Sequence, residues 1–335
     1  MGYHLDNVGR WLLASAPRIG GAYAALIAPG EPKPRTQPNW RFAYEYYEQR
    51  RWMACRRGAL WEAAGRGRIA VPLTLRWYHG TRVDVLLGND NSLCLYVCGS
   101  FEPNEFAFLD RMLQPGMVFV DVGANDGYYT LFAANRVGPS GRVLAVEPSS
   151  RERSNLERNI ARNRLANVTV LPVALGAESG NADLRLAQGK HSGHNTLGNF
   201  ANDGVLAESV ETVEVLTLDR VVSDLALTKL DVVKIDVEGA EASVIAGGRQ
   251  VLKAMRPLIL LEISDRALRG QGSDARKLIA LLRSELGYEI GVFSTETGGI
   301  ERLDNGGNLS PNVLAVPRER VAEIVGTGSA VAQAD

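Results

Sequence analysis

Short apolar runs alternate with amphipathic segments along most of this chain. Five runs are largely apolar, as expected of strands buried on both faces of a sheet, and they cover residues 118–122, 143–146, 168–175, 232–235 and 258–261. Segments with helical spacing lie among them, at 128–135, 149–164 and 275–286. This alternation predicts an α/β fold around a mostly parallel sheet. Two further strands, at 288–293 and 312–316, are predicted to close the sheet as a hairpin.

Shorter elements complete the pattern. Residues 83–87 and 92–98 are predicted to form two strands around the turn 88–91, followed by a helix at 106–113. Alternating polar and apolar residues predict two more strands, at 182–186 and 211–218.

The first 75 residues are predicted to form a helical extension with a proline-rich linker at 29–39. Within the extension, residues 40–64 form a predicted helix in which aromatic side chains are interspersed with arginines. Such a helix can serve as a lid, as a homo-oligomer contact or as a peripheral contact with a membrane or glycan, or it can pack its aromatics on the main domain. We expect the main domain to cover residues 76–318 and residues 319–335 to form a disordered tail.

Composition narrows the classes of function. Hydrophobic residues make up 45% of the chain, charged residues 22%, and the net charge is −1, which is typical of a globular protein and argues against a nucleic-acid binder. Cys55, Cys94 and Cys98 are too few for a disulfide framework or a zinc set, so a reduced, cytoplasmic protein is expected. The sequence contains no run of 18 apolar residues and no signal-peptide pattern.

The turn after the strand at 118–122 carries the first chemical signal. Asp121 lies near the end of this strand, and Gly123, Asn125 and Gly127 follow within five positions before a predicted helix. In an open α/β sheet, such a strand–turn–helix unit binds a nucleotide-like ligand. The spacing is not Gly-x-Gly-x-x-Gly, and the flanking carboxylates Asp121 and Asp126 disfavour a pyrophosphate. S-adenosylmethionine, which carries a sulfonium and an ammonium but no phosphate, suits the turn better.

Acidic residues recur at the ends of the predicted strands. Glu147 ends the second strand, at the place where a Rossmann unit holds the ribose hydroxyls, and Asp236 and Glu262 end two later strands. Because the carboxyl ends of parallel strands meet at one edge of a sheet, we expect these acids to gather there with Asp121. That edge is the predicted site.

Six motifs within residues 80–318 point to a known family: 101–103 (FEP), 120–129 (VDVGANDGYY), 146–148 (VEP), 234–241 (KIDVEGAE), 256–262 (RPLILLE) and 312–315 (NVLA). In these motifs the chain resembles the FkbM family of S-adenosylmethionine-dependent methyltransferases, and 234–241 is the most specific of them. The resemblance implies a class I (Rossmann-like) methyltransferase with a seven-stranded, mostly parallel sheet. It also implies O-methylation of a hydroxyl on a sugar, a glycan or glycolipid, or a polyketide-type acceptor. Residues 1–75 lie outside the resemblance.

The residues expected to bind S-adenosylmethionine lie at the first turn, at the end of the second strand and at the end of the third: Asp121, Gly123, Ala124, Asn125, Gly127, Tyr128, Glu147, Pro148 and Ala174. The residues expected to face the acceptor and carry the catalysis are Asp236, Glu238, Glu262 and His194. Glu238 and Glu241 are expected to begin the helix after Asp236, where Glu241 can act simply as a helix-cap acid.

Two routes can ionise the acceptor hydroxyl. In the first, a carboxylate or His194 is the general base, although His194 can also be an ordinary polar residue of the loop 188–196. In the second, Asp236 and Glu262 hold a Mg²⁺ that lowers the pKa of the hydroxyl, and Glu238 takes the proton. Two other classes remain open: a non-catalytic S-adenosylmethionine-binding or scaffold protein, and an NAD-dependent dehydrogenase.

Overall fold

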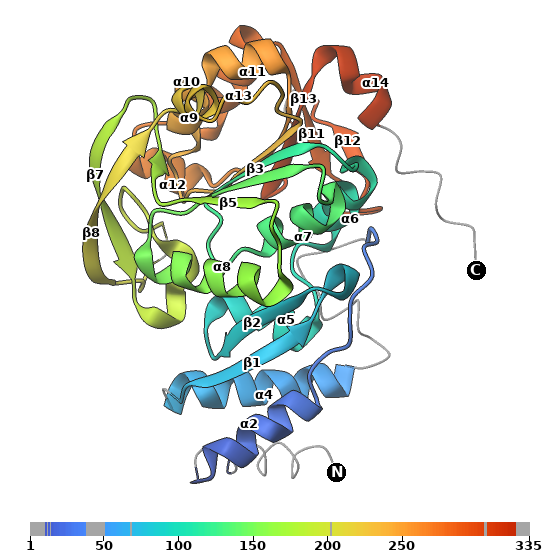
Figure 1. Ribbon diagram of the computed structural model, residues 1–335, viewed down its shortest axis with the longest axis vertical. Coiled ribbons are helices and arrows are strands. Elements are labelled where there is room, and N and C mark those ends of the chain that lie inside the picture. The colour runs from blue at the N-terminus through green and yellow to red at the C-terminus, as the bar shows by residue number, and fades with distance from the viewer. Residues whose placement is uncertain are drawn as a thin grey trace, which may run out of the picture.

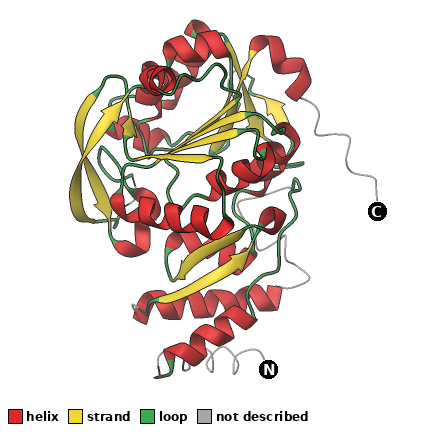
Figure 2. Ribbon diagram, viewed as in Figure 1, coloured by secondary structure: helices red, strands yellow, loops and turns green. Residues whose placement is uncertain are grey.

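The computed structural model describes residues 11, 13, 15–37, 51–67, 69–201, 203–304 and 307–325. Within this part of the chain, a central sheet has the strand order β12-β11-β13-β10-β9-β3-β4-β5, and helices cover both of its faces (Figures 1 and 2). Its strands are β3 (Val118–Val122), β4 (Arg142–Val146), β5 (Val168–Leu171), β9 (Val232–Ile235), β10 (Leu258–Glu262), β11 (Tyr288–Phe293), β12 (Ile300–Arg302) and β13 (Asn312–Pro317).

The direction of the strands confirms the predicted α/β sheet. β5, β4, β3, β9 and β10 pair in parallel, and β13 runs antiparallel to both β10 and β11. The predicted closing hairpin is therefore the pair β11–β13. The short strand β12, within the loop that follows β11, adds an eighth strand to the expected seven.

Alternate residues of the strands pack into two apolar cores. Val118, Val120 and Val122 face a core shared with α9 (Leu218–Asp224), α10 (Glu241–Gly247), α11 (Arg249–Met255), α12 (Asp265–Gly270) and α13 (Ala275–Ala280). Phe119 faces the other core, together with α6 (Pro103–Met112) and α7 (Tyr128–Val137). β3 is buried over its full length, with apolar side chains on both faces and Asp121 as its one polar residue. Its carboxyl end lies at the edge of the sheet where the site is found.

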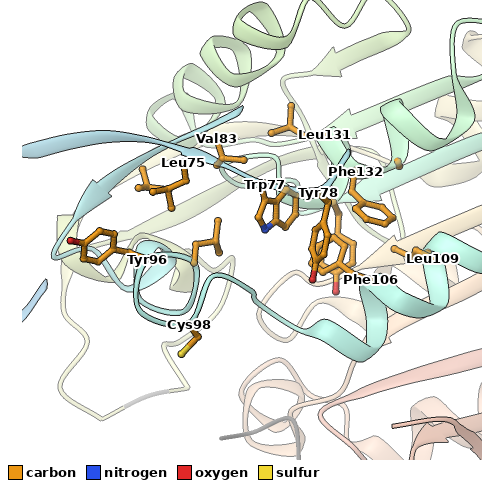
Figure 3. Packing of buried hydrophobic residues seen from close by; sticks show 14 of the residues in the cluster. Leu75, Trp77, Tyr78, Val83, Tyr96, Cys98, Phe106, Leu109, Leu131 and Phe132 are labelled. Carbon is orange, nitrogen blue, oxygen red and sulfur yellow. The ribbon is translucent and has the colours of Figure 1, made fainter. Parts of the chain in front are cut away.

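The N-terminal elements pack into the same core as Phe119. They are α2 (Pro17–Leu26), α4 (Arg51–Gly67) and the antiparallel pair β1 (Val71–Arg76) and β2 (Arg82–Leu87), which lie below the sheet in Figure 1. The predicted extension ends at residue 75. Figure 3 shows Leu75, its last residue, in the same cluster as Tyr96, Phe106 and Phe132 of the predicted main domain. The apolar core is thus continuous across that boundary.

Residues 92–98 are a helix and not the predicted strand. They belong to α5 (Asp90–Cys98), whose first turn is capped by the side chain of Asn89, which accepts a hydrogen bond from the Asn91 N–H, and whose last turn ends at Gly99 in a left-handed conformation. Buried Ser92, Leu95 and Tyr96 follow helical spacing, and the partner of β2 is β1, which the sequence did not indicate.

The run 168–175 forms two strands instead of one. β5 ends at Leu171, and β6 (Ala174–Leu175) leaves the central sheet to pair with β8 (Ala207–Leu216). Pro172 separates the two because it lacks the N–H that a continuous ladder needs. β8 also pairs with β7 (Gly180–Ala187), which confirms the strands predicted at 182–186 and 211–218.

The structure covers part of the helix predicted at 40–64 and part of the tail predicted at 319–335. The first half of the helix predicted at 40–64 lies outside the described residues, and α4 covers the rest and continues to Gly67. At the other end, residues 321–325 are ordered and not disordered as expected: Val321–Ile324 form α14, and Ile324 is buried against the core.

α8 (Ser150–Asn163) is a further helix near the site. No helix among the described residues has the length and apolar character needed to cross a membrane.

Candidate active site

A cavity of about 330 Å³ opens at the carboxyl edge of the central sheet. It lies where β3, β4, β9 and β10 end side by side, as the parallel register requires. Most of the residues predicted to form the site line this cavity: Gly123, Ala124, Asn125, Tyr128, Glu147, Pro148, Ala174, His194, Asp236, Glu238 and Glu262. Asp121 and Gly127 do not belong to its lining.

Gly123 and Gly127 are required by the backbone of the turn. Both adopt left-handed conformations, with φ of +77° and +92°. A Cβ on Gly123 would lie 1.9 Å from the carbonyl oxygen of Asp236, and one on Gly127 would lie 2.5 Å from a methyl of Leu156 in α8. The first glycine therefore lets the ends of β3 and β9 approach each other, and the second lets α7 begin against α8.

Glu147 braces the turn from the end of β4. Its two carboxylate oxygens accept hydrogen bonds from the backbone N–H groups of Asn125, at 2.8 Å, and Ser149, at 2.9 Å. Burial raises the pKa of Glu147 to about 7, although both backbone hydrogen bonds act to lower it. The side chain thus faces the cavity from a fixed position, and each oxygen keeps a second lone pair for a ligand.

Lys234 holds two acids together beneath the cavity. Its Nζ lies 3.6 Å from Asp121 Oδ1 and 3.2 Å from Asp236 Oδ2, and it donates a hydrogen bond of 3.0 Å to the Gly123 carbonyl. Burial lowers the pKa of Lys234, but the charges of Asp236 and Asp121 outweigh this effect and raise it overall. Asp121, which also accepts a 2.6 Å hydrogen bond from Thr130, is fully buried and acts as the counter-ion of this lysine.

Asp236, Glu238 and Glu262 form a cluster of carboxyl groups whose oxygens lie within 4.8 Å of one another. Burial opposes ionisation of Asp236, but the charge of Lys234 and a hydrogen bond from Glu262 lower its pKa overall. The charge of Asp236, together with burial, raises the pKa of Glu262 well above its ordinary range. The two carboxyl groups therefore titrate as a coupled pair, in which Asp236 is the more readily ionised of the two.

Glu238 lies in a turn that precedes the next helix. Its φ is +52°, and α10 begins only at Glu241, so the expectation that Glu238 starts this helix is wrong. Glu241, the first residue of α10, accepts hydrogen bonds of 3.1 Å from the backbone N–H groups of Val237 and Gly239, so it holds the preceding turn instead of capping the helix, whose N-cap is Ala240. Gln271 and Thr196 donate to the Glu238 carbonyl and hold the turn in this conformation.

His194 reaches the acidic cluster from the segment 189–194. Its Nδ1 lies 3.1 Å from Glu238 Oε1, and this hydrogen bond outweighs burial and raises the pKa of His194. The segment is tied to α5 and to the glycine turn, because Asn91 Nδ2 donates to Asn125 Oδ1 at 2.7 Å and Asn125 Nδ2 donates to the Ser192 carbonyl at 3.2 Å. The helix α5, predicted as a strand, therefore forms one wall of the site.

Glu102, Tyr129 and Asn312 also belong to the site, and the sequence assigned them no role. Glu102 lines the cavity from a left-handed position, with φ of +43°, and accepts hydrogen bonds from the Tyr129 hydroxyl and from Asn312 Nδ2. Burial raises its pKa to about 7. The Tyr129 ring in turn lies 5.1 Å from Lys234 Nζ. Glu102 and Asn312 each lie in a motif shared with the family, which was the only sign in the sequence of a role in the site. Their contact with each other arises only in the folded chain.

The sheet order, the antiparallel β13 and the glycine turn after β3 define the class of protein as a Rossmann-like methyltransferase. The model of the methyltransferase FkbM domain matches residues 121–290, just over half of the chain. The chain therefore belongs to the FkbM family of methyltransferases, as the resemblance predicted.

Three relatives illustrate the range of the family. The chain is 31% identical to part of the AMB antimetabolite synthetase AmbE of Pseudomonas aeruginosa, over 54% of this chain and 10% of AmbE. It is 27% identical to the 2-O-methyltransferase NoeI of Sinorhizobium fredii, over 51% of this chain and 73% of NoeI. It is 32% identical to the 31-O-demethyl-FK506 methyltransferase FkbM of Streptomyces tacrolimicus, over 40% of this chain and 60% of FkbM. The match thus spans a tenth of AmbE and three fifths of FkbM.

Proposed function

We propose that the protein transfers a methyl group from S-adenosylmethionine to a hydroxyl of a sugar, glycan or polyketide-type acceptor. The observation that carries this proposal is a single cavity shared by the glycine turn, Glu147 and the cluster around Asp236. Two of the relatives, NoeI and FkbM, are named as O-methyltransferases, which supports a hydroxyl as the acceptor.

The charges of the cavity suit a cationic donor. Its lining has a surplus of acidic groups over Lys234 and His194: Asp90, Glu102, Glu147, Asp236, Glu238 and Glu262. Such a surface attracts a ligand with a sulfonium and an ammonium and disfavours a pyrophosphate, which argues against NAD. In this proposal Gly123 and Asn125 contact the methionine part, Glu147 accepts the ribose hydroxyls and Ala174 lies beside the adenine.

We assign Asp236 as the general base that deprotonates the acceptor hydroxyl. The sulfonium supplies an activated methyl group, so the protein has only to align the acceptor oxygen with it and receive the proton. The ionised Asp236 accepts a hydrogen bond from the hydroxyl and takes its proton as the carbon–oxygen bond forms and the carbon–sulfur bond to the sulfonium breaks, which releases S-adenosylhomocysteine. The hydrogen bond from Glu262 holds the Asp236 carboxylate in place, and the charge of Lys234 favours its ionised form.

His194, oriented by Glu238, is the second candidate for the base. The two assignments are separated by comparing Asp236→Asn with His194→Ala. We expect Asp236→Asn to lower methyl transfer by about 10² to 10⁴-fold, the usual contribution of a general base, with unchanged binding of S-adenosylmethionine. Full activity in Asp236→Asn together with its loss in His194→Ala would assign the base to the histidine.

Mg²⁺ fits the acid cluster poorly. Lys234 Nζ already lies 3.2 Å from Asp236 Oδ2 and balances its charge, and the charge of Asp236 raises the pKa of Glu262, so an ion here would have to displace both the ammonium group and a proton. We therefore assign no step to Mg²⁺. The expected result is that adding Mg²⁺ to chelator-treated protein leaves the rate unchanged, and a clear increase would restore the metal route through Asp236 and Glu262.

The donor is tested by thermal unfolding with S-adenosylmethionine, S-adenosylhomocysteine or NAD. At about 100 times its dissociation constant, a true ligand stabilises the folded state by roughly 2.7 kcal/mol. We expect the first two compounds to raise the unfolding temperature and NAD to leave it unchanged. A shift with NAD alone, or with none of the three, would contradict the proposal. Binding of the donor with no methyl transfer to any hydroxyl acceptor would favour a scaffold role instead.

A further inference from the structure

We infer that Asp90, His191 and His194 form a site for a borderline divalent metal ion, such as Zn²⁺ or Co²⁺, at the mouth of the cavity. Each of the three residues offers a ligand atom, and these atoms lie within 4.8 Å of one another. Asp90 comes from the first turn of α5 and the two histidines come from the segment 189–194. This inference does not depend on the proposed methyl transfer.

The ligand types select the metal. Two imidazoles and one carboxylate suit Zn²⁺, Co²⁺, Ni²⁺ or Fe²⁺, whereas Mg²⁺ prefers oxygen ligands alone. Ligand bonds of about 2.0–2.1 Å place tetrahedral donor atoms roughly 3.3 Å from one another, so on metal binding the bonded atoms of His191 and Asp90 separate and ligand atoms that lie farther apart approach one another. The His191 Nδ1–Asp90 Oδ2 contact already holds two of the three groups together.

A second carboxylate supports one of the histidines. His194 Nδ1 bonds to Glu238 Oε1 at 3.1 Å, and in the metal-bound form it keeps this bond while Nε2 binds the ion. Histidine ligands commonly donate their other ring N–H to a carboxylate in this way, which orients the ring and makes the ligand nitrogen more basic. Because the ligands bind as neutral imidazoles and a carboxylate, metal binding releases any proton that the histidines carry.

The backbone around the three ligands is fixed without a metal. Asn89 Nδ2 donates to the Gly189 carbonyl at 2.7 Å and to Ser192 Oγ at 2.8 Å, and Ser192 is buried. Asp90 and His194 line the cavity, whereas His191 does not belong to its lining. An ion bound here would therefore fasten the segment 189–194 to α5 at the wall of the cavity.

The test measures metal binding to chelator-treated, dialysed protein without donor or acceptor. Titration with Co²⁺, followed by its visible absorption, and with Zn²⁺, followed by calorimetry, is expected to show one saturable site. We expect His191→Ala and Asp90→Asn each to weaken it by about 100-fold or more, since even outer-shell substitutions cost 10–100-fold. Donor binding, measured separately, should persist in His191→Ala, so a failure here is distinct from a failure of the proposed function.

Two control variants make the result decisive. His79→Ala removes another histidine, whose Nε2 lies 2.9 Å from Asp110, a pair with the same chemistry outside the cavity lining. Glu262→Gln alters the acidic cluster, which is the rival metal site. Both variants should bind Co²⁺ like the wild type. The inference is overturned if no saturable binding occurs, if His191→Ala binds as tightly as wild type, or if only Glu262→Gln loses the ion.

Discussion

Replacing Lys234 by methionine should destabilise the protein mainly through Asp121. Lys234 is 5% exposed and Asp121 is fully buried, so the variant leaves a buried carboxylate with no positive partner. Asp236 loses the same partner, but its side chain is 33% exposed and water compensates for much of that loss. Methionine keeps most of the apolar contact with the Tyr129 ring, so the lost charge is the principal change.

Protonation of Asp121 sets an upper limit to the unfolding free energy that Lys234→Met can lose. Instead of staying charged, Asp121 can take up a proton in the folded variant, and from its ordinary pKa of 3.8 this costs roughly 4 kcal/mol at pH 7, at 1.36 kcal/mol per pH unit. Breaking a buried ion pair by removing one partner typically costs 3–5 kcal/mol, which agrees with this value. The pKa of Asp121 is raised already in the wild type, because burial outweighs the charge of Lys234, and losing Lys234 raises it further. The deficit of the variant therefore grows as pH rises above 3.8 and should be smaller at pH 5, where the corresponding upper limit is about 1.6 kcal/mol.

The assay is denaturant unfolding of Lys234→Met at pH 5, 6 and 7, beside the wild type. The double variant Asp121→Asn/Lys234→Met removes both buried charges and should recover most of the lost stability, because the introduced amide oxygen can still accept the Thr130 hydrogen bond. Asp236→Asn alone, which keeps the Lys234–Asp121 pair, should cost about 1 kcal/mol or less. A Lys234→Met deficit below about 1 kcal/mol at pH 7, or one that does not change with pH, would refute this reasoning.

Two further substitutions test the turn and a second buried acid. Gly123→Ala should cost about 3 kcal/mol or more in unfolding free energy, because its Cβ meets a carbonyl at 1.9 Å, while Gly138→Ala, with φ of +63° and nothing within 4 Å, should cost only about 1 kcal/mol. Glu105 is buried with a pKa raised to about 8 by burial, so it should lower wild-type stability by roughly 2 kcal/mol between pH 6 and pH 8, because the carboxyl is ionised in the unfolded chain but keeps its proton in the folded chain until the pH nears 8. Glu105→Gln should remove the part of the decrease that Glu105 causes and leave the part due to Glu102 and Glu147, measured by denaturant unfolding at both pH values, whereas the exposed Glu157→Gln should keep the whole decrease. Equal pH profiles for both variants would contradict the Glu105 assignment.

The sequence predicted the central sheet and most of the cavity lining because both depend on local pattern. A buried parallel strand is apolar on both faces, so β3, β4, β9 and β10 were recognisable from their own residues. Their acids had to meet, because parallel strands end at one edge of the sheet. Asp236 and Glu262 were therefore placed at the cavity correctly, as neighbours, without any contact being known.

Tertiary structure decided the features that depend on contacts between distant segments. The run 92–98 has apolar residues compatible with strand or helix, and the cap at Asn89 and the β1–β2 pairing settle it as α5. Asp121 was expected at the ligand, but the buried Lys234 turns it into a counter-ion.

The same holds for Glu102 and for the histidines. Glu102 reaches the cavity through a left-handed backbone and meets Asn312, which is 210 positions away in the chain. Asp90 and His191 meet across 101 positions because a helix that local pattern misassigned packs against a polar loop. Residue spacing along the sequence determines which side chains share a strand or turn, but ionisation, counter-ions and cavity walls arise from packing between elements, which only the folded chain defines.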